Sequence, residues 1–182
     1  MRGSFAAIVV GLLGALGCGN ADGASGLEGA EAVAALPART KTVGYDLRRL
    51  RPVDDVPLVE MFDRLRADAM KQGKQVAVLF SADWCEPCRH LALELGNMHP
   101  PADIGHIRIL EFKEEDWEGV TRMNEVNALR VRWEPTKSTY PILVVIDAEG
   151  NKVEEMHEAR ERLEQAGKPT TLPAWFRELR QS

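Results

Sequence analysis

From about residue 40 onward, segments whose hydrophobic residues have helical spacing alternate with segments whose hydrophobic residues have the pattern of a strand. The first stripe with helical spacing is formed by Leu58, Met61, Phe62, Leu65 and Ala69. We expect Asp55 to cap this helix, Pro57 to lie in its first turn and Gly73 to end it. The next segment, 75–81, holds a continuous apolar run of strand length, which is typical of a central strand covered on both faces.

Four further segments have the pattern of strands. The most β-prone is 141–146, which a turn separates from a short strand near Lys152. Segment 107–112 alternates apolar with charged residues and predicts another strand. Segment 42–47 predicts a short first strand. Strands that alternate in this way with helices indicate an α/β fold in which helices pack on a sheet.

The remaining segments predict helices. Segment 89–98 forms the body of a helix after the buried strand, and 173–179 forms a final helix with an apolar face. The charged segment 154–165 is expected to be a solvated helix. A further helix is expected over 116–129, with its core side formed by Trp117, Val120, Met123 and Val126 or Asn127. We find no internal repeat and no second domain.

Length and charge limit the classes of function. The chain has 182 residues, 45% of them hydrophobic, which corresponds to one globular domain with a tail. Its formal net charge is −5 and it contains no basic cluster. Proteins that bind nucleic acid draw most of their affinity from clustered Lys and Arg, so we expect no nucleic-acid partner.

The first 17 residues have the features of a secretory signal. Arg2 precedes an apolar run over 5–16, and no acidic residue occurs before Asp22. The run is too short for an ordinary membrane span. We therefore expect export, with cleavage of the signal after residue 17.

Cys18 follows the expected cleavage position. This arrangement resembles a bacterial lipoprotein signal, in which the thiol after the cut receives diacylglycerol: Gly17 and Cys18 match, whereas Ala15 stands where leucine is usual. The small residues before the cut also suit ordinary signal peptidase, so soluble export and a retained N-terminal anchor stay open as alternatives. We expect a lipid anchor and flexible linker over 18–40 and a domain over 41–182.

A Cys-Glu-Pro-Cys motif comes directly after the buried strand and opens the next helix. At a helix N-terminus, Cys85 faces unpaired backbone N–H groups and the positive end of the helix dipole, which both stabilise a thiolate. We therefore expect Cys85 to be a nucleophile. Cys88 begins the apolar stripe of the helix and is expected to face inward as the resolving thiol.

Two other chemistries use the same spacing of cysteines. A structural disulfide is possible in an exported protein, although a bridge that closes so few residues stabilises a fold only weakly. A metal or haem-related site would need further ligands; the chain has no second motif of this kind, and the nearby His90 projects elsewhere from the helix. A redox-active dithiol is the favoured interpretation, with these two as alternatives.

The buried strand, segment 82–88 and the following helix are similar to the active-site region of the thioredoxin superfamily, and the resemblance extends over about residues 55–180. It implies a thioredoxin-like fold, with a central mixed sheet flanked by helices. It also places a cis proline opposite the dithiol, and Pro141 matches that position. The resemblance implies that Trp84, Tyr140 and Pro141 contact the substrate, with the backbone of Tyr140 offered to an extended peptide.

The two residues between the cysteines, Glu86 and Pro87, resemble those of exported, membrane-tethered thioredoxins of cytochrome c maturation. A carboxylate beside Cys85 opposes the thiolate, and a less stable thiolate makes the disulfide harder to reduce. We therefore expect a reductant rather than an oxidant.

Two features depart from the thioredoxin pattern. Members of that family commonly bury an aspartate six residues before the first cysteine as a proton acceptor for the resolving thiol, and this chain has Leu79 there. Glu86 is then the acceptor closest in sequence, and water is the alternative. The spacing from Cys88 to Pro141 is also long, and the surplus over 133–138 is expected to shape the substrate groove.

The leading hypothesis is a protein-disulfide oxidoreductase of the cell envelope that faces the periplasm and reduces disulfides of exported proteins or passes electrons within a relay. Catalysis would use Cys85, Cys88 and Glu86 with no cofactor or metal, and a membrane electron donor would restore the dithiol. We expect a monomer attached to the membrane through Cys18. The competing hypothesis is a non-enzymatic metal- or haem-handling module of cytochrome maturation that uses the same thiols.

Overall fold

The computed structural model describes residues 41–137 and 139–180. The signal expected over 1–17, Cys18 and the linker expected over 18–40 lie outside the described residues. Within the described part of the chain, no helix has both the length and the apolar character needed to cross a membrane.

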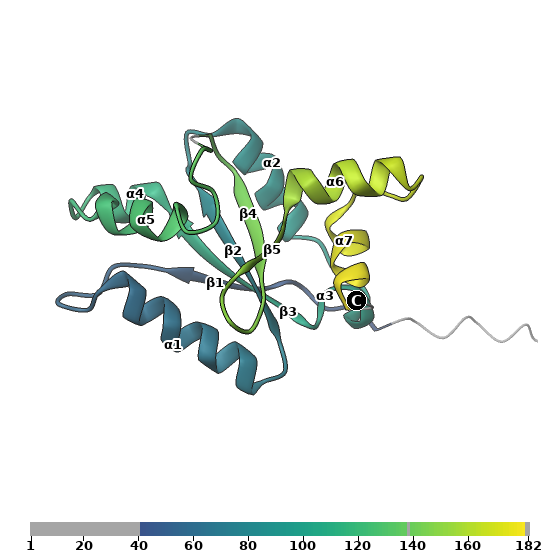
Figure 1. Cartoon of the computed structure of the whole chain (residues 1–182), viewed down its shortest axis with the longest axis horizontal. Helices are drawn as coiled ribbons and strands as arrows, with labels where there is room; N and C mark the ends of the chain where they lie inside the picture. Colours follow the sequence, from purple (N-terminus) through teal and green to yellow (C-terminus); the bar gives the residue numbers. More distant parts are fainter. Residues whose placement is uncertain (1–40, 138, 181–182) are drawn as a thin grey trace, which may run out of the picture. The chain divides into compact units, whose positions relative to one another are not determined.

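The secondary structure alternates between strands and helices, as the sequence pattern predicts (Figure 1). The strands are β1 (Asp46–Leu50), β2 (Gln75–Ser81), β3 (Ile107–Lys113), β4 (Ile142–Ile146) and β5 (Lys152–Glu155). The helices are α1 (Leu58–Lys71), α2 (Glu86–Leu95), α3 (Pro101–Ile104), α4 (Glu114–Glu118), α5 (Met123–Arg130), α6 (Met156–Gln165) and α7 (Leu172–Leu179).

The strands form one mixed sheet in the order β1-β3-β2-β4-β5. β1, β3 and β2 run parallel, whereas β4 is antiparallel to β2 and β5 is antiparallel to β4. Parallel strands need a crossover connection, which α1 supplies between β1 and β2, and α2 with α3 between β2 and β3. The sheet and its flanking helices confirm the predicted α/β class and thioredoxin-like fold.

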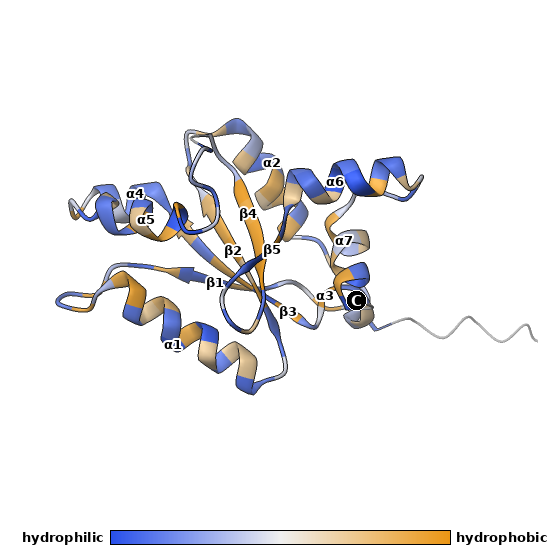
Figure 2. Ribbon diagram, viewed as in Figure 1, coloured by the Kyte–Doolittle hydropathy of each residue, from blue (hydrophilic) through white to orange (hydrophobic). Residues whose placement is uncertain are grey.

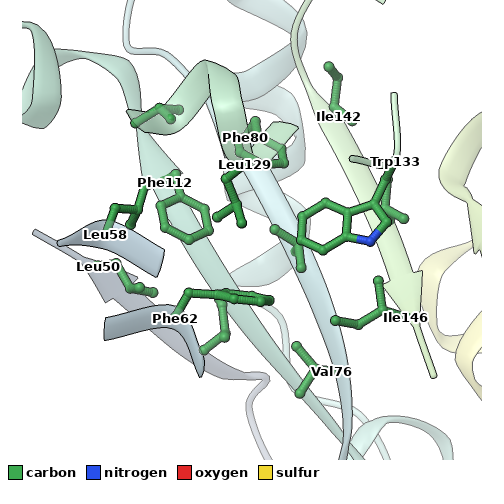
Figure 3. Packing of buried hydrophobic residues seen from close by; sticks show 14 of the residues in the cluster. Leu50, Leu58, Phe62, Val76, Phe80, Phe112, Leu129, Trp133, Ile142 and Ile146 are labelled. Carbon is green, nitrogen blue, oxygen red and sulfur yellow. The ribbon is translucent and has the colours of Figure 1, made fainter. Parts of the chain in front are cut away.

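β2 is the central strand, and its alternate residues enter two hydrophobic clusters. Val76, Val78 and Phe80 belong to the cluster that α1, α4 and α5 cover, part of which Figure 3 shows. Ala77 and Leu79 belong to the opposite cluster, which α2, α6 and α7 cover. All five side chains are at most 2% exposed. The continuous apolar run of this strand is therefore the result of burial on both faces, as predicted.

The predicted cap of the first helix is wrong. Asp55 has a φ of 59°, in the left-handed region, and α1 begins after Pro57 without a side-chain cap from its own segment. The backbone N–H of Leu58 instead donates to Oε2 of Glu125 at 2.8 Å. A carboxylate from α5 thus satisfies one of the free N–H groups at the start of α1. Gly73, with a φ of 68°, follows the end of the helix as predicted.

The helix predicted over 116–129 is divided into α4 and α5. Thr121, between them, has a φ of 58°, a conformation that a right-handed helix does not contain. Trp117 and Val126 are buried as predicted, but Val120 is 47% exposed because it lies in this turn rather than on a helix face. A local hydrophobic period does not reveal such a turn.

The other elements match the predictions to different degrees. β2, β3, β4 and α7 agree with their predicted segments to within one residue. β1 starts later than the predicted 42–47, and α2 ends before Gly96, leaving Met98 outside the helix and exposed. Figure 2 shows that most residues of α6 are hydrophilic, as expected for a solvated helix. The side of α6 formed by Met156, Ala159 and Leu163 is nevertheless buried, and it packs in the same hydrophobic cluster as Ala77 and Leu79 of β2.

Candidate redox site

Cys85 is the N-cap residue of α2, at the end of the short loop that leaves β2. Its backbone is extended, and its Sγ accepts a hydrogen bond from the backbone N–H of Cys88 at 3.2 Å. Pro87 lies in the first turn of the helix, where a missing N–H costs no helical hydrogen bond. The sulfur thus lies beside the free N–H groups and the positive end of the helix dipole, as predicted, and both favour a thiolate.

Cys85 and Cys88 form a disulfide, with Cα atoms 5.2 Å apart. The two residues are only 4% and 6% exposed. With Ala82 they form a small buried cluster against which Tyr140 packs. Cys88 faces inward as predicted. Cys85 is buried to a similar extent, so solvent exposure does not distinguish the two cysteines. They differ in their position on α2, because Cys85 is the N-cap and Cys88 lies in the first turn.

Pro141 follows Tyr140 through a cis peptide bond, which confirms the predicted geometry. It directly precedes β4, whose residue Ile142 pairs with Phe80 of β2. Because β2 leads into the cysteine loop, this antiparallel register brings the start of β4 to the same edge of the sheet as the dithiol. The packing of Tyr140 on the buried cysteine cluster agrees with that placement.

Trp84 and Tyr140 share a carboxylate that the sequence analysis did not single out. The two rings lie with their centroids 6.0 Å apart, and Trp84 is 65% exposed. The indole Nε1 of Trp84 donates to Oε1 of Glu114 at 3.2 Å, and the same carboxylate acts electrostatically on the Tyr140 hydroxyl. Burial first, and the neighbouring Glu114 carboxylate second, raise the pKa of Tyr140 to about 12.

Residues at the end of β3 and the start of α4 also hold the loop before Cys85. The backbone N–H of Asp83 donates to Oε1 of Glu115 at 2.6 Å. The side chain of Asp83 forms an ion pair with Lys113, and this pairing holds the pKa of the Asp83 carboxyl below its usual range. On the other side, Arg89 of α2 donates to the backbone carbonyl of Asp83 at 3.0 Å. The loop is thereby fixed between β3 and α2.

A surface cavity of about 430 Å³ lies beside Pro141 and Pro87, the residue that precedes Cys88. Its lining includes Pro87, Pro141 and the basic side chains of His90, His157 and Arg160. The remaining lining is mainly apolar side chains and hydroxyl groups from α2, α6 and the segment before α7. A peptide bound beside the cis proline would have this cavity next to it.

Two other sequence candidates are Glu86 and the loop over 133–138. Glu86 is the first residue of α2 and is exposed. In the loop expected to shape the substrate groove, Trp133 is instead part of the hydrophobic core, and its Nε1 donates to the carbonyl of Gly150 at 2.8 Å. Glu134 pairs with Lys152 at 2.5 Å. These contacts attach the loop to the hairpin of β4 and β5.

Across 41–137 and 139–180, no three His, Cys, Asp or Glu side chains gather in a way that could hold a metal ion.

Comparison with known proteins gives distant structural matches alone. No protein-family model and no curated protein matches the chain. A disulphide isomerase from Xylella fastidiosa Temecula1 superimposes with a TM-score of 0.49 at 18% identity, over 72% of this chain and 98% of that one. Thioredoxin h (PtTrxh4) from poplar gives 0.40 at 18% identity, over 66% and 92%, and a DsbH oxidoreductase gives 0.38 at 17%, over 62% and 73%. The assignment of the fold rests on its own strand order.

The raised pKa of Tyr140 predicts a late ionisation. The chain has two tyrosines, so in a Tyr45→Phe variant the phenolate absorbance reports Tyr140 alone. We expect ionisation at a pH of about 12 in the folded protein, and an earlier one in Glu114→Gln, because the neutral phenol is favoured by burial and by the carboxylate. Since the folded pKa lies above the unfolded one, this stabilisation is complete below about pH 10 and is lost as the pH rises through the folded pKa.

The measurement is a spectrophotometric pH titration, with Tyr45→Phe/Tyr140→Phe as the control that removes the signal. Ionisation of folded Tyr45→Phe near the ordinary tyrosine pKa would contradict the effects of burial and of Glu114 on Tyr140.

Proposed function

We propose that this protein is a thiol-disulfide oxidoreductase that reduces disulfides of exported proteins. The observation that carries the proposal is the position of the disulfide, with Cys85 at the N-cap of α2 and cis Pro141 at the adjacent strand end. A purely structural bridge between residues three apart would add little stability, because it closes a very short loop. Its placement at a helix N-terminus suits reactivity instead.

The reaction is dithiol exchange. The Cys85 thiolate attacks one sulfur of a substrate disulfide, forms a mixed disulfide and releases the other substrate sulfur as a thiolate that takes up a proton. Cys88 then loses its proton and attacks Sγ of Cys85. The second substrate thiol leaves, the Cys85–Cys88 disulfide forms, and two electrons have passed to the substrate. An upstream dithiol donor reverses this oxidation of the protein.

The polypeptide around the target disulfide would bind in extended form beside Tyr140 and Pro141. The resemblance to thioredoxins implies that the backbone of Tyr140 pairs with this peptide, in the manner of strand addition. The exposed Trp84 and the neighbouring cavity of about 430 Å³ offer apolar contact on either side. Side chains of a substrate would thus be recognised by contact with Trp84 and with the cavity wall.

Location and direction of electron flow complete the proposal. The signal-like segment 1–17 and Cys18 support a lipid-anchored protein of the cell envelope that faces the periplasm. A membrane electron donor would then be within reach of the tethered domain. Glu86 supports a reductant, because its carboxylate lies one residue from the thiolate that it opposes.

Replacing the resolving thiol should trap the reaction halfway. In a Cys88→Ser variant, Cys85 still attacks but nothing releases the mixed disulfide, so conjugates with exported proteins should accumulate. Non-reducing electrophoresis with mass spectrometry of the trapped partners measures this, and Cys85→Ser is the matched control that traps nothing. Absence of conjugates, together with stoichiometric metal or haem bound by the reduced protein and lost with either cysteine, would favour a non-enzymatic handling module.

A redox titration against glutathione tests the direction of electron flow. We expect a midpoint nearer the value of about −270 mV known for thioredoxin than the value of about −120 mV of the oxidant DsbA. Glu86→Gln should raise the midpoint by on the order of 10 to 30 mV, because removing the carboxylate stabilises the Cys85 thiolate and so the reduced form. A shift of 30 mV corresponds to about 1.4 kcal/mol. Glu60→Gln, on the exposed side of α1, is the control. A midpoint near that of DsbA would overturn the assignment as a reductant.

The lipid anchor has a direct readout in the intact mass of the mature protein. We expect cleavage before Cys18 and a diacylglycerol adduct on that residue, with recovery in the membrane fraction. Cys18→Ala should lose the adduct and the membrane association together. A mature chain of unmodified mass with a free Cys18 thiol would show soluble export instead.

A further inference from the structure

Glu111 is a buried carboxylate that the exchange reaction described above does not use. It lies on β3 and is 8% exposed. The parallel registers place it between Leu79 of β2 and Arg49 of β1, so these three side chains share one row of the sheet. Ser81 donates to its Oε1 at 2.9 Å. A carboxylate is thus buried one strand away from Leu79, where a buried acid was expected and is missing.

Glu111 and Cys88 line the same small cavity. The cavity has a volume of about 40 Å³ and lies between the ends of β2 and β3 and the side of α2 that carries Cys88, Leu91 and Leu95. A polar cavity needs about 10 to 15 Å³ to hold one water molecule, so there is room for a water to link the thiol to the carboxylate. Cys85 and Glu86 are not among the lining residues. The inward path from the dithiol therefore starts at Cys88 and reaches Glu111.

The other charged groups around this cavity already have partners. On β3 and the cysteine loop, Lys113 forms an ion pair with Asp83, and on α2, Arg89 donates to the carbonyl of Asp83. On β1, Arg49 binds Asp116 at 2.6 and 2.8 Å. Among the described residues, no salt bridge includes Glu111, and the hydrogen bond from Ser81 is to a neutral hydroxyl. Within the described part of the chain, Glu111 therefore has a hydroxyl partner but no ion-pair partner.

We propose that Glu111 is the proton acceptor for Cys88 in the second half of the exchange; the proposal rests on the oxidoreductase function. When Cys85 carries the substrate sulfur, the Cys88 thiol passes its proton through the cavity water to Glu111. The Cys88 thiolate then attacks Sγ of Cys85, the bond from Cys85 to the substrate sulfur breaks, and the substrate leaves as a thiolate. Glu111 releases the proton afterwards, and no further reactant is consumed.

Single-turnover kinetics separate the two halves of the reaction. In a Cys18→Ala background, the reduced protein has two thiols and should release two equivalents of thionitrobenzoate from dithiobis(nitrobenzoate). The first release depends on reagent concentration and reports Cys85, whereas the second does not and reports Cys88. We expect Glu111→Gln to slow the second release about 100-fold at neutral pH, as for loss of a general base, and to leave the first unchanged.

The pH profile distinguishes proton transfer from a structural effect. The difference between wild type and Glu111→Gln should shrink as the pH rises, because hydroxide then removes the thiol proton. Glu111→Asp should recover part of the rate, and Glu60→Gln on α1 should match wild type. An unchanged second release and pH profile in Glu111→Gln would overturn the role of Glu111 alone. If the Cys18→Ala protein without further substitution released one equivalent of thionitrobenzoate rather than two, the dithiol exchange itself would be overturned.

A measurement on the unsubstituted side chain guards against a variant that fails to fold. The carboxyl carbon of Glu111 can be followed by nuclear magnetic resonance across a pH titration of the reduced and the oxidised protein. We expect the two titration curves to differ, because a proton on Cys88 is present in the reduced form alone. Superimposable curves in the two redox states would overturn the proposal.

Discussion

Burial of both faces of β2 is the constraint on which the rest of the domain depends. A shift of this strand by one residue would turn each of its side chains toward the opposite cluster, so the packing holds its register against both neighbours. Phe80 is thereby held opposite Ile142, and Ser81 beside Lys113. Pro141 directly precedes Ile142, and Glu114 directly follows Lys113. The register of one strand therefore brings the dithiol, the cis proline and the residues that hold Trp84 to one edge of the sheet.

The parts that sequence analysis predicted correctly depend on local pattern. The bounds of β2 follow from its apolar run, the position of Cys85 follows from the start of a helix, and the cis bond at Pro141 follows from a resemblance carried by neighbouring residues. The missed features depend on register between distant segments. Glu125 caps α1 from 67 residues away in sequence, and Glu114 reaches Trp84 across 30 residues. No periodicity in either segment encodes such a pairing.

Acidic residues near the dithiol differ in what surrounds them, and this decides what each can do. Glu115 accepts a backbone N–H from Asp83, and Glu114 accepts a hydrogen bond from the indole of Trp84, so both fix geometry. Glu86 is exposed and follows Cys85 directly in the chain, so solvent and salt screen the effect of its charge. Glu111 is the one of these four that is buried and lines the cavity of Cys88. Proximity in sequence to the cysteines is therefore a poor guide to the path of a proton.

The location of the buried acid on β3 rather than β2 has a physical reason. Position 79 lies between Glu111 and Leu143 in the middle of the sheet, and Leu79 packs in the cluster formed with α2, α6 and α7. A carboxylate there would have an apolar neighbour on β4 and would interrupt that cluster, at a desolvation cost that a buried charge recovers only from polar partners. At position 111, the carboxylate accepts a hydrogen bond from Ser81 at 2.9 Å and has Arg49 of β1 as its neighbour on the other side. Placing the acid on β3 keeps β2 apolar while leaving the carboxylate at the same cavity as Cys88.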